Sequence, residues 1–333
     1  MRLLLLDTAS LYFRAYFGMP DSLRSPDGRP VNAVRGLLDM IAFLVAEHRP
    51  DRLVACWDDD WRPAFRVEAI GTYKEHRVAE LRADGPDVEE MPEDLRAQIP
   101  VIVDVLAALG IARVGSPGFE ADDVIGTLVA RELAGRGSGA PGDDGGTPAD
   151  GGTPDAHARS GPDVGIVTGD RDLFQLVDDD AGIAVLYPAR GVRDPDVVDQ
   201  ARLAEKYGVP TGTAYAEMAV LRGDPSDGLP GVAGIGEKTA AKLLAAFGTL
   251  DRVLEAAATG EKGVTPSQRT RIAAAADYLA VAPGVVRVAD DAPLEPFDDT
   301  LPDAPADPEA LDALAARWGL TSSVHRVVSA LQA

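Results

Sequence analysis

The stretch Val164-Gly-Ile-Val-Thr-Gly-Asp170-Arg-Asp172 joins a short apolar run to two aspartates that follow it directly. A short apolar run of this kind is typical of a buried strand. The same arrangement occurs at 3–7, where four leucines precede Asp7, and at 53–58, where an apolar run precedes Asp58. The carboxyl ends of parallel strands open onto one shared crevice. The pattern therefore predicts carboxylates from several strands at one edge of a sheet.

Strands and helices alternate along the first half of the chain. Strands are predicted at 2–6, 52–57, 164–168 and 183–187, and helices at 31–47, 95–109 and 121–133. This alternation predicts an α/β fold with a mostly parallel central sheet and helices on both faces. Beyond 187 the pattern becomes helical and punctuated by glycine. We therefore expect an α/β core at 1–190, a helical lobe at 191–288, and an acidic, proline-rich tail at 289–333 with a final helix near 308–318.

Residues 135–163 are rich in glycine, proline and aspartate and contain the repeat Asp-Gly-Gly-Thr-Pro, at 144 and again at 150. Such a segment buries too little apolar surface to order itself, so we expect a disordered insertion. The single cysteine, Cys56, lies in a predicted buried strand, which favours a reducing compartment, the cytoplasm. The apolar run at 3–6 is too short for a secretory signal, and no stretch is long enough to span a membrane.

The formal net charge of -22 argues at first sight against a nucleic-acid partner. The acidic residues are unevenly spread, however, because 288–316 hold nine of them and no Lys or Arg. Residues 62–82 instead carry Arg62, Arg66, Lys74, Arg77 and Arg82, a local field that can attract phosphate. The overall charge therefore does not exclude DNA.

Acidic side chains follow several of the predicted apolar runs. Brought together, they would repel one another unless hard cations neutralised them. Ligands that are all oxygen favour Mg²⁺ or Mn²⁺, and two such ions can promote phosphodiester hydrolysis. For any one residue, helix capping is the alternative. The candidates are Asp7, Asp58, Glu120, Asp122, Asp123, Asp170, Asp172, Asp224 and Asp227.

The segment Gly231-Val-Ala-Gly234-Ile-Gly236-Glu-Lys238-Thr239 contains closely spaced glycines. It lacks the Gly-Lys of a phosphate-binding loop and the preceding strand of a dinucleotide fingerprint. We interpret 229–247 as a helix-hairpin-helix, whose backbone N–H groups would face DNA phosphates, with Lys242 adding charge. A purely structural glycine turn is the alternative.

Apolar and cationic side chains alternate just after Asp58. Phe65, Arg66, Tyr73 and Lys74 fall near helical spacing, which predicts an amphipathic helix beside the metal crevice. Phe13, shortly after Asp7, is a candidate to stack on a base, with core packing as the alternative.

Taken together, these motifs resemble the 5′-nuclease family, which includes flap endonucleases and the N-terminal nuclease domain of bacterial DNA polymerase I. The resemblance runs from Leu3 to about Val288. It rests on Asp7 with Phe13-Arg14, on Asp58 with Phe65-Arg66 and Tyr73-Lys74-x-x-Arg77, on Gly118-Phe-Glu120-Ala-Asp122-Asp123, on Thr168-Gly-Asp170-Arg-Asp172, and on Gly223-Asp224-Pro-Ser-Asp227-Gly-Leu-Pro-Gly231 with Gly234-Ile-Gly236-Glu-Lys-Thr.

The resemblance implies a PIN-like nuclease core with a helical arch at about 62–92 that passes a 5′ single strand. Asp7, Asp58, Glu120 and Asp122 would bind the catalytic metal with Asp123 beside them, and Asp170, Asp172 and Asp227 would bind a second, with Asp224 in support. Arg66, Lys74 and Arg77 would steady the scissile phosphate, Phe13 with Arg14 would meet the DNA junction, and the hairpin would grip the duplex and hold a potassium ion.

The sequence departs from the family pattern at two places. The acidic run at 58–60 is one residue longer than usual, so Asp60 could take the role of Asp58, and Gly228 stands where Asn is common. The expected function is that of a stand-alone, monomeric 5′-3′ exonuclease or flap endonuclease in replication or repair. The expected substrate is flapped or nicked DNA, and the choice between RNA-primed and all-DNA 5′ ends stays open. Alternatives are a PIN-like ribonuclease and a structure-specific DNA-binding protein without catalysis.

Overall fold

The computed structural model describes residues 1–82, 85–137 and 161–333. Its central sheet has six strands among these residues, in the order β5-β2-β1-β6-β7-β8. Neighbouring strands are parallel except for the pair β7 and β8. The expected mostly parallel α/β sheet is therefore confirmed. Its strands are β1 (Leu3–Asp7), β2 (Arg52–Cys56), β5 (Ala112–Val114), β6 (Val164–Val167), β7 (Ile183–Tyr187) and β8 (Asp196–Val198).

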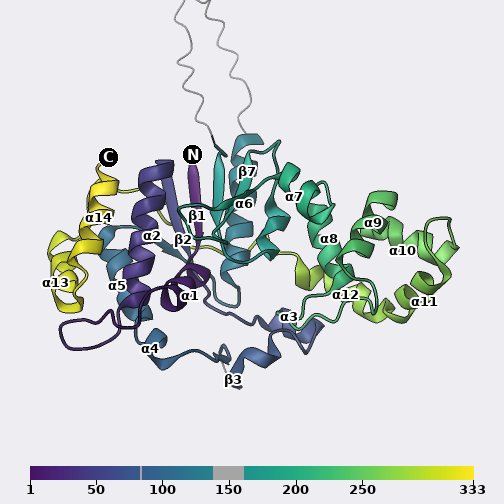
Figure 1. Cartoon of the computed structure of the whole chain (residues 1–333), viewed down its shortest axis with the longest axis horizontal. Coiled ribbons are helices and arrows are strands. Elements are labelled where there is room, and N and C mark those ends of the chain that lie inside the picture. The colour runs from purple at the N-terminus through teal and green to yellow at the C-terminus, as the bar shows by residue number, and fades with distance from the viewer. Residues whose placement is uncertain (83–84, 138–160) are drawn as a thin grey trace, which may run out of the picture.

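Helices cover both faces of the sheet (Figure 1). Alternate leucines of β1 enter opposite cores, Leu3 and Leu5 on one face and Leu4 and Leu6 on the other. Since both faces are buried, the strand needs an unbroken apolar run rather than a polar alternation. The core helices are α1 (Thr8–Gly18), α2 (Asn32–His48), α5 (Ile99–Leu109) and α6 (Ala121–Gly137), with the 3-10 helix η2 (Asp172–Leu176) after β6.

A lobe of helices extends from one end of the core, on the right in Figure 1. The helices are α7 (Gln200–Tyr207), α8 (Gly212–Arg222), α9 (Glu237–Phe247), α10 (Leu250–Thr259), α11 (Pro266–Ala274) and α12 (Ala276–Val286). Most of the expected insertion at 135–163 lies outside the described residues. In the described part of the chain no helix is both long and apolar enough to cross a bilayer.

The C-terminal region differs from the expected tail. Two helices close the chain, α13 (Pro308–Trp318) and α14 (Thr321–Leu331), where one was predicted. They pack on α5 and α2 and bury Leu311, Trp318 and Val327 in the core. Ahead of them, the Leu53 N–H donates to the Asp299 carbonyl at 2.9 Å. The expectation of a single final helix was wrong, because the second half of the region has an apolar face of its own.

The arch segment, residues 62–92, is less helical than predicted. Helix α3 (Ala64–Ala69) ends well before Lys74, and η1 (Glu75–Arg77) follows a turn at 71–74. Strands β3 (Val78–Glu80) and β4 (Val88–Glu89) then pair antiparallel, ahead of α4 (Glu93–Arg96). Gly71 and the left-handed backbone of Lys74, with φ of 47°, interrupt the predicted helix.

Candidate active site

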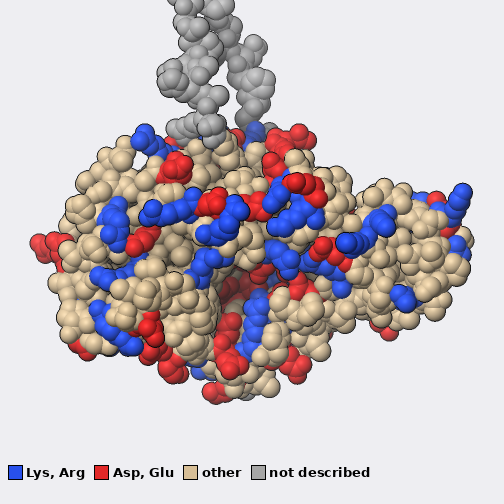
Figure 2. All heavy atoms as spheres, viewed as in Figure 1, with Lys and Arg blue, Asp and Glu red and all other residues tan. Residues whose placement is uncertain are grey.

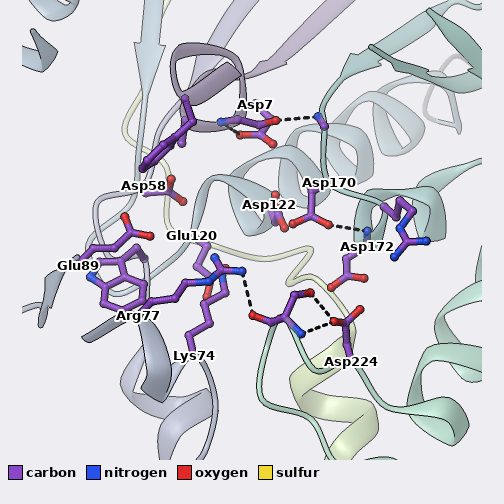
Figure 3. Close-up of a pocket in the computed structure, with 17 residues that line it drawn as sticks. Asp7, Asp58, Lys74, Arg77, Glu89, Glu120, Asp122, Asp170, Asp172 and Asp224 are labelled. Atoms are coloured by element: carbon purple, nitrogen blue, oxygen red, sulfur yellow. Dashed lines mark hydrogen bonds and ion pairs between the residues drawn. The ribbon is translucent and has the colours of Figure 1, made fainter. Parts of the chain in front are cut away.

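A cavity of about 370 Å³ lies at the carboxyl ends of the central strands. Figure 2 shows the hollow in the middle of this face, with acidic atoms inside it and Lys and Arg side chains around its rim. The predicted metal residues that line it are Asp7, Asp58, Glu120, Asp122, Asp170, Asp172 and Asp224 (Figure 3). Carboxylates separated by more than 200 positions in sequence are therefore brought to one place.

Short strands and tight turns hold these carboxylates in place. Asp7 ends β1 and caps α1 by accepting from the Ser10 N–H at 3.1 Å, so capping and cavity lining coexist at this residue. Its other oxygen accepts from the Thr168 hydroxyl at 2.6 Å. Asp170 accepts from the Asp172 N–H at 2.9 Å, which fixes the turn after β6. The carboxylates are thus positioned by protein hydrogen bonds.

The open choice between Asp58 and Asp60 has a geometric answer. Asp58 lines the cavity and accepts from the Ala121 N–H at 2.7 Å, at the start of α6. Asp60 lies outside the cavity lining and instead accepts from the Arg62 N–H at 3.1 Å, within its own turn. Asp58 is therefore the better candidate for a ligand.

Two residues of the arch segment bind the carboxylate of Glu120. It accepts from the Lys74 ammonium group at 2.6 Å and from the Tyr73 hydroxyl at 2.7 Å. All three side chains are buried, and Lys74 also lines the cavity. Lys74 therefore lies where a phosphate approaching the carboxylates would meet a cation.

Arg66 and Asp123 lie outside the lining of the cavity, unlike most of the other predicted site residues. They form a two-pronged ion pair at 2.8 and 2.6 Å, and both are fully or almost fully buried. Asp123 also accepts from the Glu120 and Ala289 N–H groups. With its oxygens occupied in this way, Asp123 caps the start of α6 and Arg66 neutralises it. Neither residue lines the cavity, although Arg66 also pairs with Glu120, which does, at 3.4 Å.

The loop between α8 and α9 supplies the remaining acids. Asp224 lines the cavity and accepts from the Ser226 N–H at 2.8 Å. Asp227 is buried outside the lining and pairs with Arg77 at 3.3 Å. Arg77 itself lines the cavity, beside Lys74. Two of the three predicted phosphate-binding cations thus face the carboxylates, whereas Asp227 reaches the site through Arg77.

Side chains that sequence reasoning did not single out complete the lining. Glu89 enters from the arch segment, where no motif marks it. Thr168 lies outside the lining but donates to Asp7, and its place directly after the buried strand β6 could have marked it. The further lining side chains are Ser10, Trp61, Arg171 and Ser226.

Burial, and after it the neighbouring carboxylates, raises the pKa values of acids in the cavity. Burial, reinforced by Asp58, raises the pKa of Asp7 to about 7, and burial raises that of Asp58 to about 6. Burial and the neighbouring Asp170 hold the pKa values of Asp122 and Asp172 well above their usual range. Such shifts mean that negative charge is unfavourable here without a compensating cation.

The donor set fits divalent metal ions of the hard type. Among the described residues, no group of three or more His, Cys, Asp or Glu side chains is already placed to hold a metal ion. The cavity nevertheless offers several carboxylates and hydroxyls, and the groups that line it present oxygen donors without sulfur. Mg²⁺ takes one or two carboxylates and keeps several waters, so an open arrangement of this kind suits it.

The predicted hairpin lies between α8 and α9. Gly231 has φ of 64°, and a Cβ there would lie 2.4 Å from the Arg222 carbonyl carbon, so the turn requires glycine. The carbonyl of Gly234 accepts from Arg271 at 2.9 Å. Gly236 caps α9, Thr239 is half-buried, and Lys238 and Lys242 are exposed on this helix. Their exposure leaves these lysines free to meet a phosphate backbone.

Phe13 and Arg14 lie on α1, next to the cavity. Phe13 lines the cavity and is half-buried, and its ring lies 5.3 Å from that of Tyr12. Tyr12 is buried in the core, so of the two aromatic residues Phe13 is the one available to a ligand. Arg14 is half-buried and lies outside the lining.

The metal-free protein is expected to lose stability as pH rises from about 4 to about 7. The folded-state pKa values of Asp7 and Asp58, about 7 and about 6, exceed the ordinary value of 3.8. Their contribution is complete below the ordinary value and is lost as pH rises through the folded values. His48, whose pKa is lowered by burial, works in the opposite direction but is one group.

Thermal unfolding midpoints at several pH values, with chelator and with Mg²⁺, test this expectation. Mg²⁺ should remove most of the decline, because it neutralises the carboxylates. A midpoint that rises with pH in chelator would contradict the argument.

Comparison with known proteins agrees with this geometry. Residues 2–139 match the family model described as the 5′-3′ exonuclease N-terminal, resolvase-like domain, and 211–309 match the 5′-3′ exonuclease C-terminal SAM fold. The chain is 58% identical to a 5′-3′ exonuclease of Streptomyces coelicolor, over 99% of this chain and 100% of that protein. It is 48% identical to a 5′-3′ exonuclease of Mycobacterium tuberculosis, over 99% and 97%.

A solved structure has a similar fold. The bacteriophage T5 flap endonuclease, in a pseudo-enzyme–product complex with DNA and metal ions, matches with a TM-score of 0.60 at 15% identity, over 100% of both chains. The resemblance inferred from the motifs is confirmed.

Proposed function

The chain belongs to the 5′-3′ exonuclease family and is a nuclease, and we propose that it hydrolyses phosphodiester bonds near the 5′ end of flapped or nicked DNA. The observation that carries this proposal is the cavity in which seven of the nine predicted carboxylates meet Lys74 and Arg77. Acidic groups that repel one another suit metal binding, and cations beside them suit a phosphate.

We assign the metal ions to the residues that line the cavity. Asp7, Asp58, Glu120 and Asp122 would hold one, and Asp170 and Asp172 a second with Asp224 in support. When bound, two Mg²⁺ or Mn²⁺ ions supply an activated water and stabilise the leaving oxygen. Lys74 and Arg77 would hold the scissile phosphate against them. In this proposal the other three predicted residues act through their partners, Arg66 through Asp123 and Glu120, and Asp227 through Arg77.

The rest of the molecule suits a branched DNA substrate. Phe13 would stack on the base at the junction, and the exposed lysines of α9 would contact duplex phosphates. A potassium ion on the hairpin carbonyls, a monomeric state and a cytoplasmic location, where the buried Cys56 would stay reduced, complete the proposal.

A panel of 5′-labelled substrates tests the function directly. Flap, nick, blunt duplex and RNA–DNA hybrid would each be incubated with Mg²⁺, Mn²⁺ or chelator, with and without potassium. We expect cleavage near the 5′ end of flap and nick that requires a divalent ion. Tight binding without products would instead support a structure-specific DNA-binding protein, and preference for single-stranded RNA would support a ribonuclease.

A further inference from the structure

Gly228, in the loop between α8 and α9, lies directly against the backbone of the arch segment. A Cβ built on Gly228 would lie 2.0 Å from the Thr72 carbonyl oxygen, far inside van der Waals contact. Its φ of 71° is also a conformation that residues with side chains rarely adopt. In this chain, both the backbone conformation and the close approach therefore favour glycine at position 228.

Hydrogen bonds fix this contact on both sides of Gly228. The Thr72 hydroxyl donates to the Gly228 carbonyl at 2.8 Å, and the Lys74 N–H donates to the Asp227 carbonyl at 3.0 Å. Arg77 donates to the Ser226 carbonyl at 2.9 Å. Three residues of the arch segment thus bind three successive carbonyls of the loop, so the two segments are docked and not merely adjacent.

The docked segment carries the two cations that line the cavity. Lys74 has φ of 47°, a left-handed conformation that costs a residue with a side chain about 1–2 kcal/mol. Such a conformation persists only where the surroundings determine it. Here the N–H of Lys74 is held by the loop while its ammonium group reaches Glu120. Figure 3 shows Lys74 and Arg77 close to Glu120, with Asp224 nearby.

We propose that Gly228 is a positioning residue for cleavage. Because it has no side chain, Gly228 leaves room for the Thr72 carbonyl, and the arch segment can dock on the α8–α9 loop. This docking places Lys74 and Arg77 at the phosphate position. Gly228 touches no reacting atom and acts through those two side chains. This inference rests on the proposed function, since it takes Lys74 and Arg77 to hold the scissile phosphate.

Gly228→Ala tests the proposal, with Gly208→Ala as the matched control. Gly208 has φ of 73°, but a Cβ there would lie 3.6 Å from the Ala241 Cβ, so this change shares the conformational cost without the clash. We expect Gly228→Ala to lower the single-turnover cleavage rate on flap DNA by about 10-fold or more. DNA affinity in chelator should change less than about 3-fold, and the control should change neither quantity by more than about 2-fold.

A double-variant background separates positioning from general damage. If Gly228 acts through Lys74 and Arg77, then adding Gly228→Ala to the Lys74→Ala, Arg77→Ala protein should cost less than about 2-fold more. The proposal would be overturned if Gly228→Ala lowered the rate of the double variant by the same factor as it lowers the rate of the unmodified protein. Thr72→Val, which removes the hydroxyl that binds the Gly228 carbonyl, is a milder variant expected to lower the rate by about 2- to 5-fold.

Hydrogen exchange at the Lys74 N–H provides a readout that does not depend on activity. Exchange should become faster in Gly228→Ala and stay unchanged in Gly208→Ala, because only the first change breaks the bond to Asp227. If the unmodified protein cleaves no substrate, the proposed function fails while exchange still reports on docking. If the unmodified protein cleaves and Gly228→Ala matches the control in rate and exchange, the inference fails.

Discussion

Asp170→Ala and Asp122→Ala are each expected to reduce cleavage of flap DNA in Mg²⁺ by about a thousandfold or more. Metal-assisted stabilisation of the transition state is worth several kcal/mol, and about 4 kcal/mol corresponds to a factor of a thousand. Both side chains line the cavity, and Asp170 contributes to the raised pKa values of Asp122 and Asp172. Single-turnover rates measure the loss, and binding to flap DNA in chelator should be largely retained.

The thermal stability of the metal-free variants distinguishes a loss of catalysis from misfolding. Removing one member of a cluster of like charges relieves repulsion, so the metal-free variants should unfold at the same temperature or higher. Asp180→Ala, at an exposed position outside the cavity, is the control and should leave cleavage unchanged. Cleavage that survived both cavity variants would mean that the catalytic centre lies elsewhere.

The sheet and most of its carboxylates could be predicted because both depend on local sequence. An apolar run followed by an acid places that acid at the carboxyl end of a strand, whatever the rest of the chain does. Asp7, Asp58 and Asp170 were found in this way. Asp122 and Asp123 are harder to separate, because neighbouring residues on a helix point about 100° apart. Their spacing from Glu120 favours Asp123 as the one that caps α6.

The conformation of the arch segment depends on tertiary contacts, whereas the missed C-terminal helix does not. Tyr73 and Lys74 fall at helical spacing after Arg66, but their backbone follows the α8–α9 loop instead, about 150 residues away along the chain. In the C-terminal region, Val324 and Val327 pack in the core with α2, and they fall at helical spacing in a stretch without acidic residues. This last helix was therefore within reach of the local sequence, whereas the docking of the arch segment leaves little trace in local periodicity.

Arg66→Ala is expected to destabilise the protein by about 3–5 kcal/mol, because it leaves the carboxylate of Asp123 buried without its cation. Arg66 forms two hydrogen bonds to Asp123, at 2.8 and 2.6 Å, and a third to the Val285 carbonyl at 3.1 Å. The pair thereby joins α3, α6 and the end of α12. Chemical denaturation of the metal-free protein measures the change in the free energy of unfolding.

Two comparisons show whether Arg66 is structural or binds phosphate. Arg113→Ala removes an exposed arginine whose ion pair with Asp59 spans 3.8 Å, and should cost less than about 1 kcal/mol. Arg66→Lys keeps the charge but loses the planar fork, so it should fold with an intermediate loss of stability. Its cleavage rate at temperatures where it stays folded should be close to normal, since Lys74 and Arg77 hold the phosphate. A large loss of cleavage rate in Arg66→Lys at unchanged stability would support the phosphate-binding role that the sequence motif of Arg66 suggested. It would also mean that the buried pair opens when DNA binds.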